Sequence, residues 1–390
     1  MKICAIIAEF NPFHLGHLKH LDFVKTTLGA EKIIVVMSGN FTQRGEPAIL
    51  DKFTRARHAI LAGADAVIEL PTVFATANAE IFARGAVNII DSLNVCDGIC
   101  FGVESGNENA YYSLALAMND ESKEFKKSLK EHLDKGVSLA KAKFLALKDT
   151  SNEEFDESLI SSPNNILGLE YTKAILKRES GLAIYPMLRE GDHNDKALKK
   201  GITSATSIRD KVRNGEKRKV KGNVPPFVYK DLEEYPFSFD KMIMTKLLTT
   251  STDELSKILD CTEGLENRIK ALSKDNHSVE TLVEKTSTKR YPQTRIRRIL
   301  ISNLLNIKSS FVFDALEHKL YAKILAVNSD SKDIISLLKE KSSIPLLTRK
   351  SDASVLKKTA TKCFEIDTLA CDLYSLATNT KLNENNMLII

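Results

Sequence analysis

Residues 3–17 read Ile3-Cys4-Ala5-Ile6-Ile7-Ala8-Glu9-Phe10-Asn11-Pro12-Phe13-His14-Leu15-Gly16-His17. The first six residues of this stretch form an uninterrupted apolar run, which is the pattern of a strand covered on both faces of a parallel sheet. A polar turn follows at once, and we expect a helix over about 16–27. A buried strand that leads through a polar turn into a helix is typical of an α/β sheet, which binds its ligands at the carboxyl ends of its strands.

Apolar runs and amphipathic segments continue to alternate along the chain from this first unit. We expect further strands at 32–37, 66–70, 98–102 and 182–187, and helices at 52–62 and 81–93. Residues 107–178 are mainly helical in pattern, with a break at 161–165. Strands and helices that alternate this closely predict an α/β fold, a Rossmann-like doubly wound parallel sheet with right-handed crossovers.

The second half of the chain has a different pattern. Residues 214–222 are polar, basic and flanked by glycine, and Pro225-Pro226 follow them. We therefore expect a domain boundary there, with one domain at 1–222 and a mainly helical C-terminal domain at 223–390. Helical spacing recurs at 242–248, 256–259, 265–272 and 279–284, and a strand–helix–strand unit is expected at 322–327, 333–338 and 344–347.

Composition narrows the class of protein further. The chain is 43% hydrophobic and 27% charged, which is ordinary for a water-soluble globular protein. Its six cysteines are too few for a disulfide framework in 390 residues. No apolar run is long enough to cross a membrane, and no secretory leader is recognisable, so we expect a cytoplasmic protein without a membrane partner. The net charge of +5 permits a polyanionic partner without requiring one.

The segment His14-Leu15-Gly16-His17 carries the first chemical signal. Its glycine allows a phosphate to approach the backbone, and the start of the helix supplies free N–H groups and the positive end of a dipole. Two histidines three residues apart can both donate hydrogen bonds to phosphoryl oxygens as charge develops. Two ordinary histidines at a helix start would be the more common explanation of this pattern alone. Its place directly after a buried strand favours catalytic roles for His14 and His17.

A second segment, Ser204-Ala205-Thr206-Ser207-Ile208-Arg209, opens a later helix. Hydroxyl side chains at this position commonly cap the unpaired N–H groups of a helix. The same segment also suits a clamp on triphosphate oxygens, made by Ser204, Thr206 and Arg209. The two segments together predict adenylyl transfer, in which positioning and charge stabilisation do most of the work.

The two segments resemble the motifs of the nucleotidylyltransferase superfamily, His-x-Gly-His and a later Ser-Ser/Ala-Thr-x-Ile-Arg. Longer stretches look like the bacterial tRNA(Met) cytidine acetate ligase family, and they span nearly the whole chain. They lie at 8–17, 37–47, 101–104, 163–167 and 289–298.

This resemblance implies an enzyme that activates acetate with ATP, giving acetyl-adenylate and pyrophosphate. The acetyl group would then pass to N4 of the wobble cytidine of elongator tRNA(Met), giving N4-acetylcytidine. We expect Mg²⁺ to accompany the ATP, and no side chain is assigned as a metal ligand. The implied ATP contacts are Ile7, Ala8, Glu9, Phe10, Asn11, Pro12, Phe13, His14, Leu15, Gly16, His17, Leu18, Lys19, His20, Gly102, Asn164 or Asn165, and Arg189.

Other residues fit this site from their position alone. Gly102, at the end of a strand, lies where an adenosine is expected near a topological switch point, and Arg189 follows the fifth strand. Gln43 and Arg44 follow the second strand, and they could reach acetate or pyrophosphate, or equally form salt bridges within their loop. Arg55 shares a helical face with Lys52.

A basic cluster in the second half points to RNA. We expect Arg290, Arg295, Arg297 and Arg298 to contact a phosphate backbone, with support from the basic residues at 217–221. A charge run is more often a solvated face, but the density of this one favours tRNA. Two alternatives are weaker. A small-molecule adenylyltransferase would need little sequence after residue 222, and an RNA-binding protein with structural ATP would not need both phosphate-binding segments.

Overall fold

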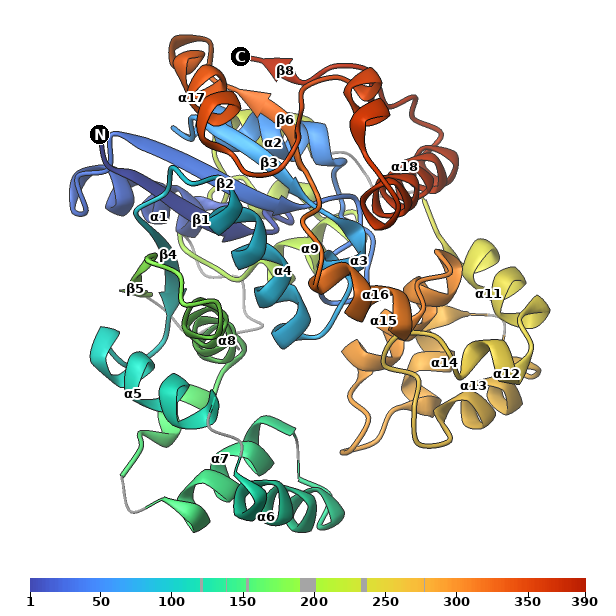
Figure 1. Cartoon of the computed structure of the whole chain (residues 1–390). Coiled ribbons are helices and arrows are strands. Elements are labelled where there is room, and N and C mark those ends of the chain that lie inside the picture. The colour runs from blue at the N-terminus through green and yellow to red at the C-terminus, as the bar shows by residue number, and fades with distance from the viewer. Residues whose placement is uncertain (120–121, 138, 152–153, 190–200, 233–236, 277) are drawn as a thin grey trace.

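The computed structural model describes residues 1–390 except 120–121, 138, 152–153, 190–200, 233–236 and 277. Its centre is a sheet in which five parallel strands lie in the order β5-β4-β1-β2-β3, as Figure 1 shows. This is the order of a Rossmann-like sheet, so the predicted fold class is confirmed. The strands are β1 (Ile3–Ala8), β2 (Lys32–Ser38), β3 (Ala66–Leu70), β4 (Gly98–Val103) and β5 (Ala183–Leu188), all within one residue of their expected bounds.

Both faces of the sheet are covered. Along β1, Ile3, Ala5 and Ile7 enter one hydrophobic core, whereas Cys4 and Ile6 enter the other. This alternation explains the unbroken apolar run, because a strand covered on both faces needs apolar side chains at every position. The core of Cys4 and Ile6 includes α1 (Leu15–Thr26), α2 (Lys52–Leu61), α9 (Ala205–Arg213) and α10 (Pro226–Asp231). The other core includes α3 (Thr72–Ala75), α4 (Ala79–Ser92), α5 (Glu108–Asn119), α8 (Pro163–Lys177) and α18 (Thr359–Thr378).

Two groups of helices project from this body. One, at the bottom of Figure 1, holds α6 (Lys123–Asp134) and α7 (Leu139–Thr150), which pack on each other beside the short helix η1 (Glu157–Ile160). The other, at the right of Figure 1, follows the segment that holds η2 (Lys217–Val220). It comprises α11 (Asp240–Thr249), α12 (Thr252–Leu255), α13 (Leu265–Ser273), α14 (Val279–Thr286), α15 (Gln293–Leu304) and α16 (Ser309–Leu316). The prediction of helix at 256–259 was wrong: α12 ends at Leu255, and Ile258 forms a bridge with Lys308.

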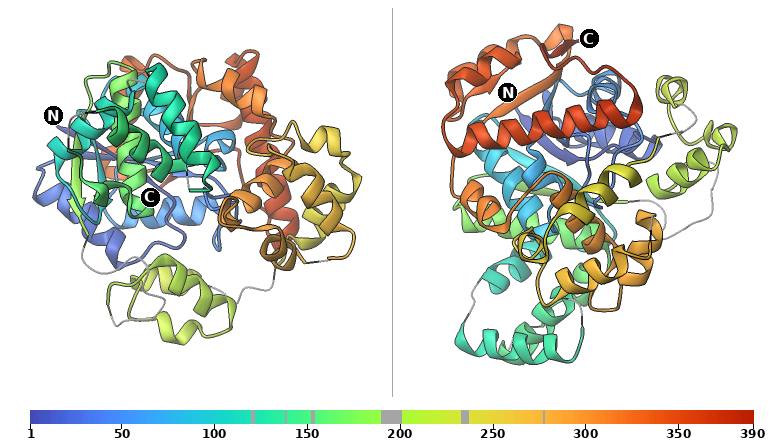
Figure 2. Two further views of the ribbon diagram at one scale, coloured as in Figure 1. Left: turned by 90° about the horizontal axis from the view of Figure 1, so that it is seen from below. Right: turned by 90° about the vertical axis from the view of Figure 1, so that its right-hand side faces the viewer.

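The chain then returns to the sheet, as the right-hand view of Figure 2 shows. The expected strand–helix–strand unit is present as β6 (Ala322–Val327), α17 (Asp333–Lys341) and β7 (Leu346–Leu347). β6 pairs antiparallel with β3, and β8 (Leu388–Ile389) pairs with β6. The short helices η3 (Ser329–Ser331) and η4 (Lys350–Val355) connect these elements. The sheet therefore extends across the boundary expected near residue 222. Part of the domain expected to be mainly helical, including the strands expected at 322–327 and 344–347, belongs to this sheet.

Among the helices that the structure describes, none is both long and apolar enough to cross a membrane.

Candidate active site

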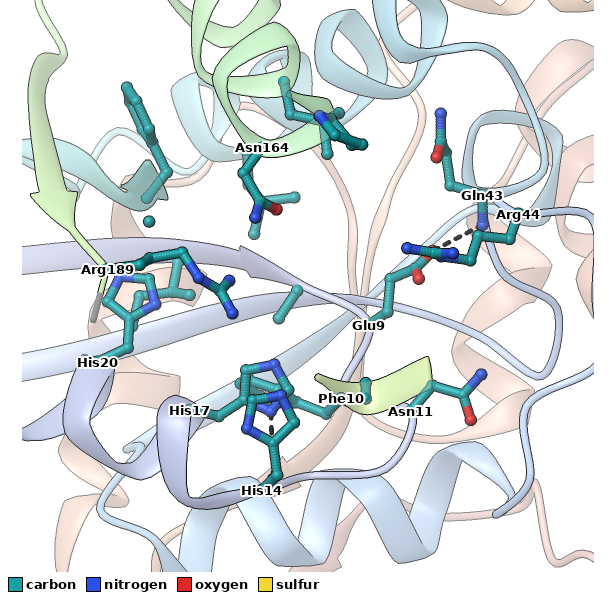
Figure 3. A pocket seen from close by; sticks show the side chains of 18 of the residues that line it. Glu9, Phe10, Asn11, His14, His17, His20, Gln43, Arg44, Asn164 and Arg189 are labelled. Carbon is teal, nitrogen blue, oxygen red and sulfur yellow. Dashed lines mark hydrogen bonds between the residues drawn. The ribbon is translucent and has the colours of Figure 1, made fainter. Parts of the chain in front are cut away.

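A cavity opens at the carboxyl ends of the central strands, between α1, α8, α9 and the loop after β2 (Figure 3). Most residues expected to contact ATP line this site cavity. They are Ile7, Ala8, Glu9, Phe10, Asn11, His14, His17, His20, Gly102, Asn164, Arg189, Thr206 and Arg209. Gly16 and Lys19 line a neighbouring pocket that shares His17, His20, Gly102 and Arg189 with the site cavity. The remaining predicted residues, Pro12, Phe13, Leu15, Leu18, Asn165 and Ser204, line neither.

The His-x-Gly-His segment makes the start of α1. His14 is the cap residue, and its Nδ1 accepts a hydrogen bond of 3.0 Å from the backbone N–H of Gly16. The imidazole of His14 lies so close that a Cβ atom at position 16 would come within 2.9 Å of it. Glycine at position 16 therefore leaves room for the His14 ring beside the first turn of α1.

The two histidines act as a pair. Their rings stack with centroids 3.7 Å apart, and Nδ1 of His17 accepts a hydrogen bond of 3.2 Å from the backbone N–H of His14. An Nδ1 atom that accepts a hydrogen bond carries no proton, so this geometry assigns the proton of each neutral ring to Nε2. Burial, together with His14, Arg189 and His20, keeps the pKa of His17 well below its usual range. His17 is therefore neutral near pH 7 and can offer its Nε2–H as a donor.

His20 lies one turn farther along α1, beside Arg189 in Figure 3. Its Nε2 is 3.2 Å from Sγ of Cys100 on β4. Burial and the Arg189 guanidinium lower the pKa of His20 from 6.5 to about 4. Two of the three histidines of the site cavity, His17 and His20, therefore stay neutral near pH 7 beside permanent cations, an arrangement that suits a polyanion without excess charge.

The second phosphate-binding segment starts α9. Ser204 is its cap residue and accepts from the backbone N–H of Ser207, so its hydroxyl serves the helix. Thr206 and Arg209 line the site cavity. The Arg209 guanidinium donates to the carbonyl of Asn11 and to the hydroxyl of Thr206, at 2.8 and 3.1 Å. Burial lowers its pKa only to about 10, so Arg209 keeps its charge. Both predicted segments therefore line one cavity, and Arg209 ties α9 to the turn that precedes the His-x-Gly-His segment.

The two adjacent asparagines at the start of α8 have different surroundings. Asn164 lines the site cavity and donates to a carboxylate oxygen of Glu104 at 2.6 Å. Asn165 is fully buried, accepts from the backbone N–H of Glu104, and donates to Ser105 and Ser158. The geometry therefore makes Asn164 the candidate for contacting ATP and gives Asn165 a structural role.

Arg189 and Gly102 form the opposite end of the site cavity, between it and the neighbouring pocket. A Cβ atom at position 102 would come within 3.1 Å of the Arg189 side chain, so the glycine makes room for it. Burial lowers the pKa of Arg189, and the nearby Glu104 counteracts this effect.

Several residues at the site were not in the predicted set. Gln43 and Arg44, for which sequence left a binding role open, line the cavity. Phe82, Phe101, Leu167 and Tyr171 form an apolar part of its wall.

Arg55, placed only by helical spacing, is fully buried under the site. It donates to the backbone carbonyls of Glu9, Ser38, Gly39 and Leu50, and so ties the ends of β1 and β2 together. The position of Arg55 in the sequence predicts a basic helical face, but it does not predict that the side chain binds these four carbonyls.

The basic cluster lies on and before α15, whose backbone closely approaches Gly45 in the loop after β2. Each of its four arginines has an acidic neighbour: Arg290 pairs with Glu263, Arg297 with Glu280 and Glu46, Arg298 with Asp260, and Arg295 approaches Glu263. Arg290 is the most exposed, at 46% of its side chain, whereas Arg298 is 11% exposed. A phosphate backbone would reach Arg290 most easily.

Fold and site together define a nucleotidyl transferase. The model of the HIGH Nucleotidyl Transferase family matches residues 1–387. The tRNA(Met) cytidine acetate ligases of Thermoanaerobacter sp. (strain X514) and Clostridium novyi (strain NT) are 39% and 37% identical to the chain. These alignments cover 97% and 96% of the chain and 96% and 95% of the relatives. The chain therefore belongs to the tRNA(Met) cytidine acetate ligase family.

Solved structures agree with this assignment. The crystal structure of Thermotoga maritima TmcAL bound with alpha-thio ATP matches with a TM-score of 0.90 and 29% identity over 100% of both chains. The apo form of the same protein matches with a TM-score of 0.93.

Proposed function

We propose that the chain is an ATP-dependent acetate ligase that acetylates N4 of the wobble cytidine of elongator tRNA(Met), giving N4-acetylcytidine. The observation that carries this proposal is the convergence of the helix starts of α1 and α9 on one cavity, in a chain that acetate ligases match along nearly its whole length. A TmcAL structure bound with an ATP analogue supports ATP as the co-substrate.

ATP would lie across the site cavity. The space beside Gly102 and Arg189, which continues into the neighbouring pocket, suits the adenosine. The triphosphate would then lie over the N-terminal ends of α1 and α9, where backbone N–H groups, Thr206 and Arg209 favour negative charge. Asn164 would bind between them, since it faces the cavity from α8.

In the first step an acetate oxygen attacks the α-phosphorus of ATP, and pyrophosphate leaves. Negative charge then grows on the phosphoryl oxygens. The Nε2–H groups of His14 and His17 are held by their Nδ1 hydrogen bonds so that they can donate to these oxygens. In the second step the cytidine amine attacks the acetyl carbonyl, the carbonyl carbon–oxygen bond to AMP breaks, and AMP leaves while the amine releases one proton.

We expect Mg²⁺ to enter with the triphosphate. Among the described residues, no group of three or more His, Cys, Asp or Glu side chains could hold a metal ion. Mg²⁺ commonly keeps few protein ligands and binds mainly through substrate phosphates, so we expect ATP to supply most of its ligands.

The tRNA would be bound by the helical region that contains α15. We propose that Arg290, Arg295, Arg297 and Arg298 contact its backbone, with Arg290 reached first because of its exposure. Arginine contacts with phosphates release the counterions condensed on the RNA, so binding should weaken with added salt. We expect such an enzyme to act in the cytoplasm.

The proposal is tested by incubating the protein with ATP and labelled acetate, with and without bulk tRNA, and digesting the RNA to nucleosides. Labelled N4-acetylcytidine that requires both ATP and acetate is the expected result. Adenylylation of a small molecule without label in RNA would support the alternative of a small-molecule adenylyltransferase. ATP binding without turnover would indicate a binding protein.

A further inference from the structure

The end of the site cavity opposite Arg189 has a chemistry of its own. In Figure 3, Arg189 and His20 lie on one side, His14, His17 and Asn164 lie in the middle, and Glu9, Gln43 and Arg44 lie on the other side. The α1 and α9 helix starts account for the phosphates, and the Gly102 end accounts for the adenosine. The end formed by the loop after β2 is left for a second substrate.

This loop holds Arg44 on a firmly fixed backbone. Phe41 and Pro47 form a bridge across its base, and the Thr42 backbone N–H donates to the carbonyl of Glu46 at 3.0 Å. The backbone N–H of Gln43 donates to the Glu9 carboxylate at 2.6 Å. Gly45 lies so close to α15 that a Cβ atom there would come within 2.3 Å of its backbone. The base of the Arg44 side chain is therefore placed before any ligand binds.

Among the described residues, Arg44 differs from Arg209 and Arg55 in having no hydrogen-bond or ion-pair partner. Arg209 donates to Asn11 and Thr206, and Arg55 donates to four carbonyls. Within the described part of the chain, no hydrogen bond or ion pair engages the guanidinium of Arg44, which points toward the middle of the cavity beside Glu9. A cation whose donors are uncommitted and face a cavity is suited to bind an anionic ligand.

An apolar wall belongs to the same cavity. Phe82 contributes from α4, and Leu167 and Tyr171 from α8. Burial raises the pKa of Tyr171 beyond its usual range, and the Glu9 carboxylate, which lines the same cavity, raises it further. A short aliphatic carboxylate matches both features. Its carboxylate suits the guanidinium, and its alkyl group suits the apolar wall.

We propose that Arg44 binds the acetate carboxylate and that the wall formed by Phe82, Leu167 and Tyr171 receives its methyl group and excludes longer chains. This subsite rests on the proposed function. Glu9 would repel a second carboxylate, and Arg44 supplies the charge that offsets this repulsion. One acetate oxygen forms the bond to the α-phosphorus while Arg44 holds the other. The bond between the α-phosphorus and the oxygen that bridges the α- and β-phosphates breaks, and its electron pair leaves with pyrophosphate.

The first test measures acetate-dependent exchange of labelled pyrophosphate into ATP. Two variants are compared with wild type. Arg44→Met removes the charge, and Arg44→Lys keeps the charge but cannot donate in the bidentate manner of a guanidinium. The KM for acetate should rise about ten- to a hundredfold in Arg44→Met, the cost of one charge-assisted contact. The Kd for ATP alone, measured by calorimetry, should stay within about twofold of wild type. Arg84→Lys is the matched control, because Arg84 pairs with Glu317 outside the cavity.

A raised Kd for ATP with an unchanged KM for acetate would assign Arg44 to the pyrophosphate and overturn the subsite. That result leaves the proposed function standing, because wild-type exchange would still depend on acetate. A wild-type protein that shows no acetate-dependent exchange would overturn the proposed function and the subsite together.

The second test enlarges the wall. Leu167 is only partly buried, so Leu167→Ala should fold. The ratio of kcat/KM for propionate to that for acetate should rise about tenfold or more, as expected when one methylene becomes tolerated. An unchanged ratio in a folded variant that still uses acetate would place the methyl group elsewhere and contradict the wall.

Discussion

The imidazole of His17 serves the fold with one nitrogen and the proposed chemistry with the other. Its Nδ1 accepts from the His14 backbone, and its Nε2 carries the proton. His17→Asn keeps an acceptor near Nδ1 and loses the donor, whereas His17→Gln keeps a donor near Nε2. We expect pyrophosphate exchange to fall about 10²–10³-fold in His17→Asn, the usual cost of a lost transition-state donor, and clearly less in His17→Gln. Equal activity of the two folded variants would contradict the assignment of the proton.

His20 gives a prediction for pH. Its pKa is about 4 in the folded chain and near 6.5 when unfolded, because burial and Arg189 oppose its protonation. As pH falls, the unfolded chain takes up this proton first, so the stabilising effect of neutral His20 is complete above about pH 6.5 and is lost toward pH 4. The loss of unfolding free energy between pH 7 and pH 5 should therefore be smaller in His20→Gln than in wild type. Equal losses in denaturant titrations would show that His20 does not contribute.

Single residues differ in how far sequence predicted them. His14, Gly16 and Arg209 belong to segments whose spacing already describes a phosphate site. Arg55 and Tyr171 could not be assigned in this way, because their partners come from separate segments that meet only in the fold. Of the adjacent Asn164 and Asn165, only the fold shows which one faces the cavity.

At the level of elements, two neighbouring hydroxyl residues at the start of α9 have different roles, one in capping the helix and one in the proposed binding of ATP. Ser204 caps the helix, and Thr206 faces the site cavity. Ser204→Ala should lower the free energy of unfolding by about 1 kcal/mol and leave the KM for ATP nearly unchanged. Thr206→Val should raise that KM severalfold with little change in stability. Denaturation and exchange kinetics on both variants provide the check. A higher KM for ATP in Ser204→Ala would mean that its hydroxyl contacts the triphosphate after all.

Elements were predictable where their signal is local. The five parallel strands are continuous apolar runs, and their bounds followed from sequence closely. The turn at 256–259 has helix-like apolar spacing because Ile258 and Leu259 are buried, but Ile258 pairs with Lys308 instead. The antiparallel pairing of β6 with β3 joins residues more than 250 positions apart, and periodicity carries no information about such a partner.

At the scale of the whole molecule, a buried charge cluster ties the C-terminal segment to the sheet. Lys52 and Lys323 each contact both Glu69 and Glu384, at 2.5–3.0 Å. Burial raises the pKa of Glu384, but Lys52 and Lys323 outweigh this effect and lower it to about 2. The cluster joins α2, β3, β6 and the segment before β8, and sequence alone could not pair these four side chains.

Glu384→Gln would leave two buried lysines with one carboxylate. We expect the variant to lose about 3–5 kcal/mol of unfolding free energy at pH 7, the usual cost of breaking a buried ion pair. Because the folded-state pKa of Glu384 is depressed, its contribution is complete above about pH 4.5 and disappears toward pH 2. Chemical denaturation at several pH values should therefore show the difference in unfolding free energy from wild type narrowing in acid.

The control is Glu340→Gln, which removes an exposed carboxylate on α17 and should leave the unfolding free energy unchanged. A similar loss in both variants would contradict a special role for the cluster.

The most direct measurement of the central claim uses acetate labelled with ¹⁸O in both oxygens, together with ATP and tRNA. If acetate attacks the α-phosphorus and the cytidine amine then attacks the acetyl carbonyl, one acetate oxygen must remain on the AMP that is released. Mass spectrometry should find one ¹⁸O atom in AMP for each N4-acetylcytidine formed, and none in pyrophosphate. Unlabelled AMP, or label in phosphate or pyrophosphate, would contradict an acetyl-adenylate formed in the site of His14 and His17.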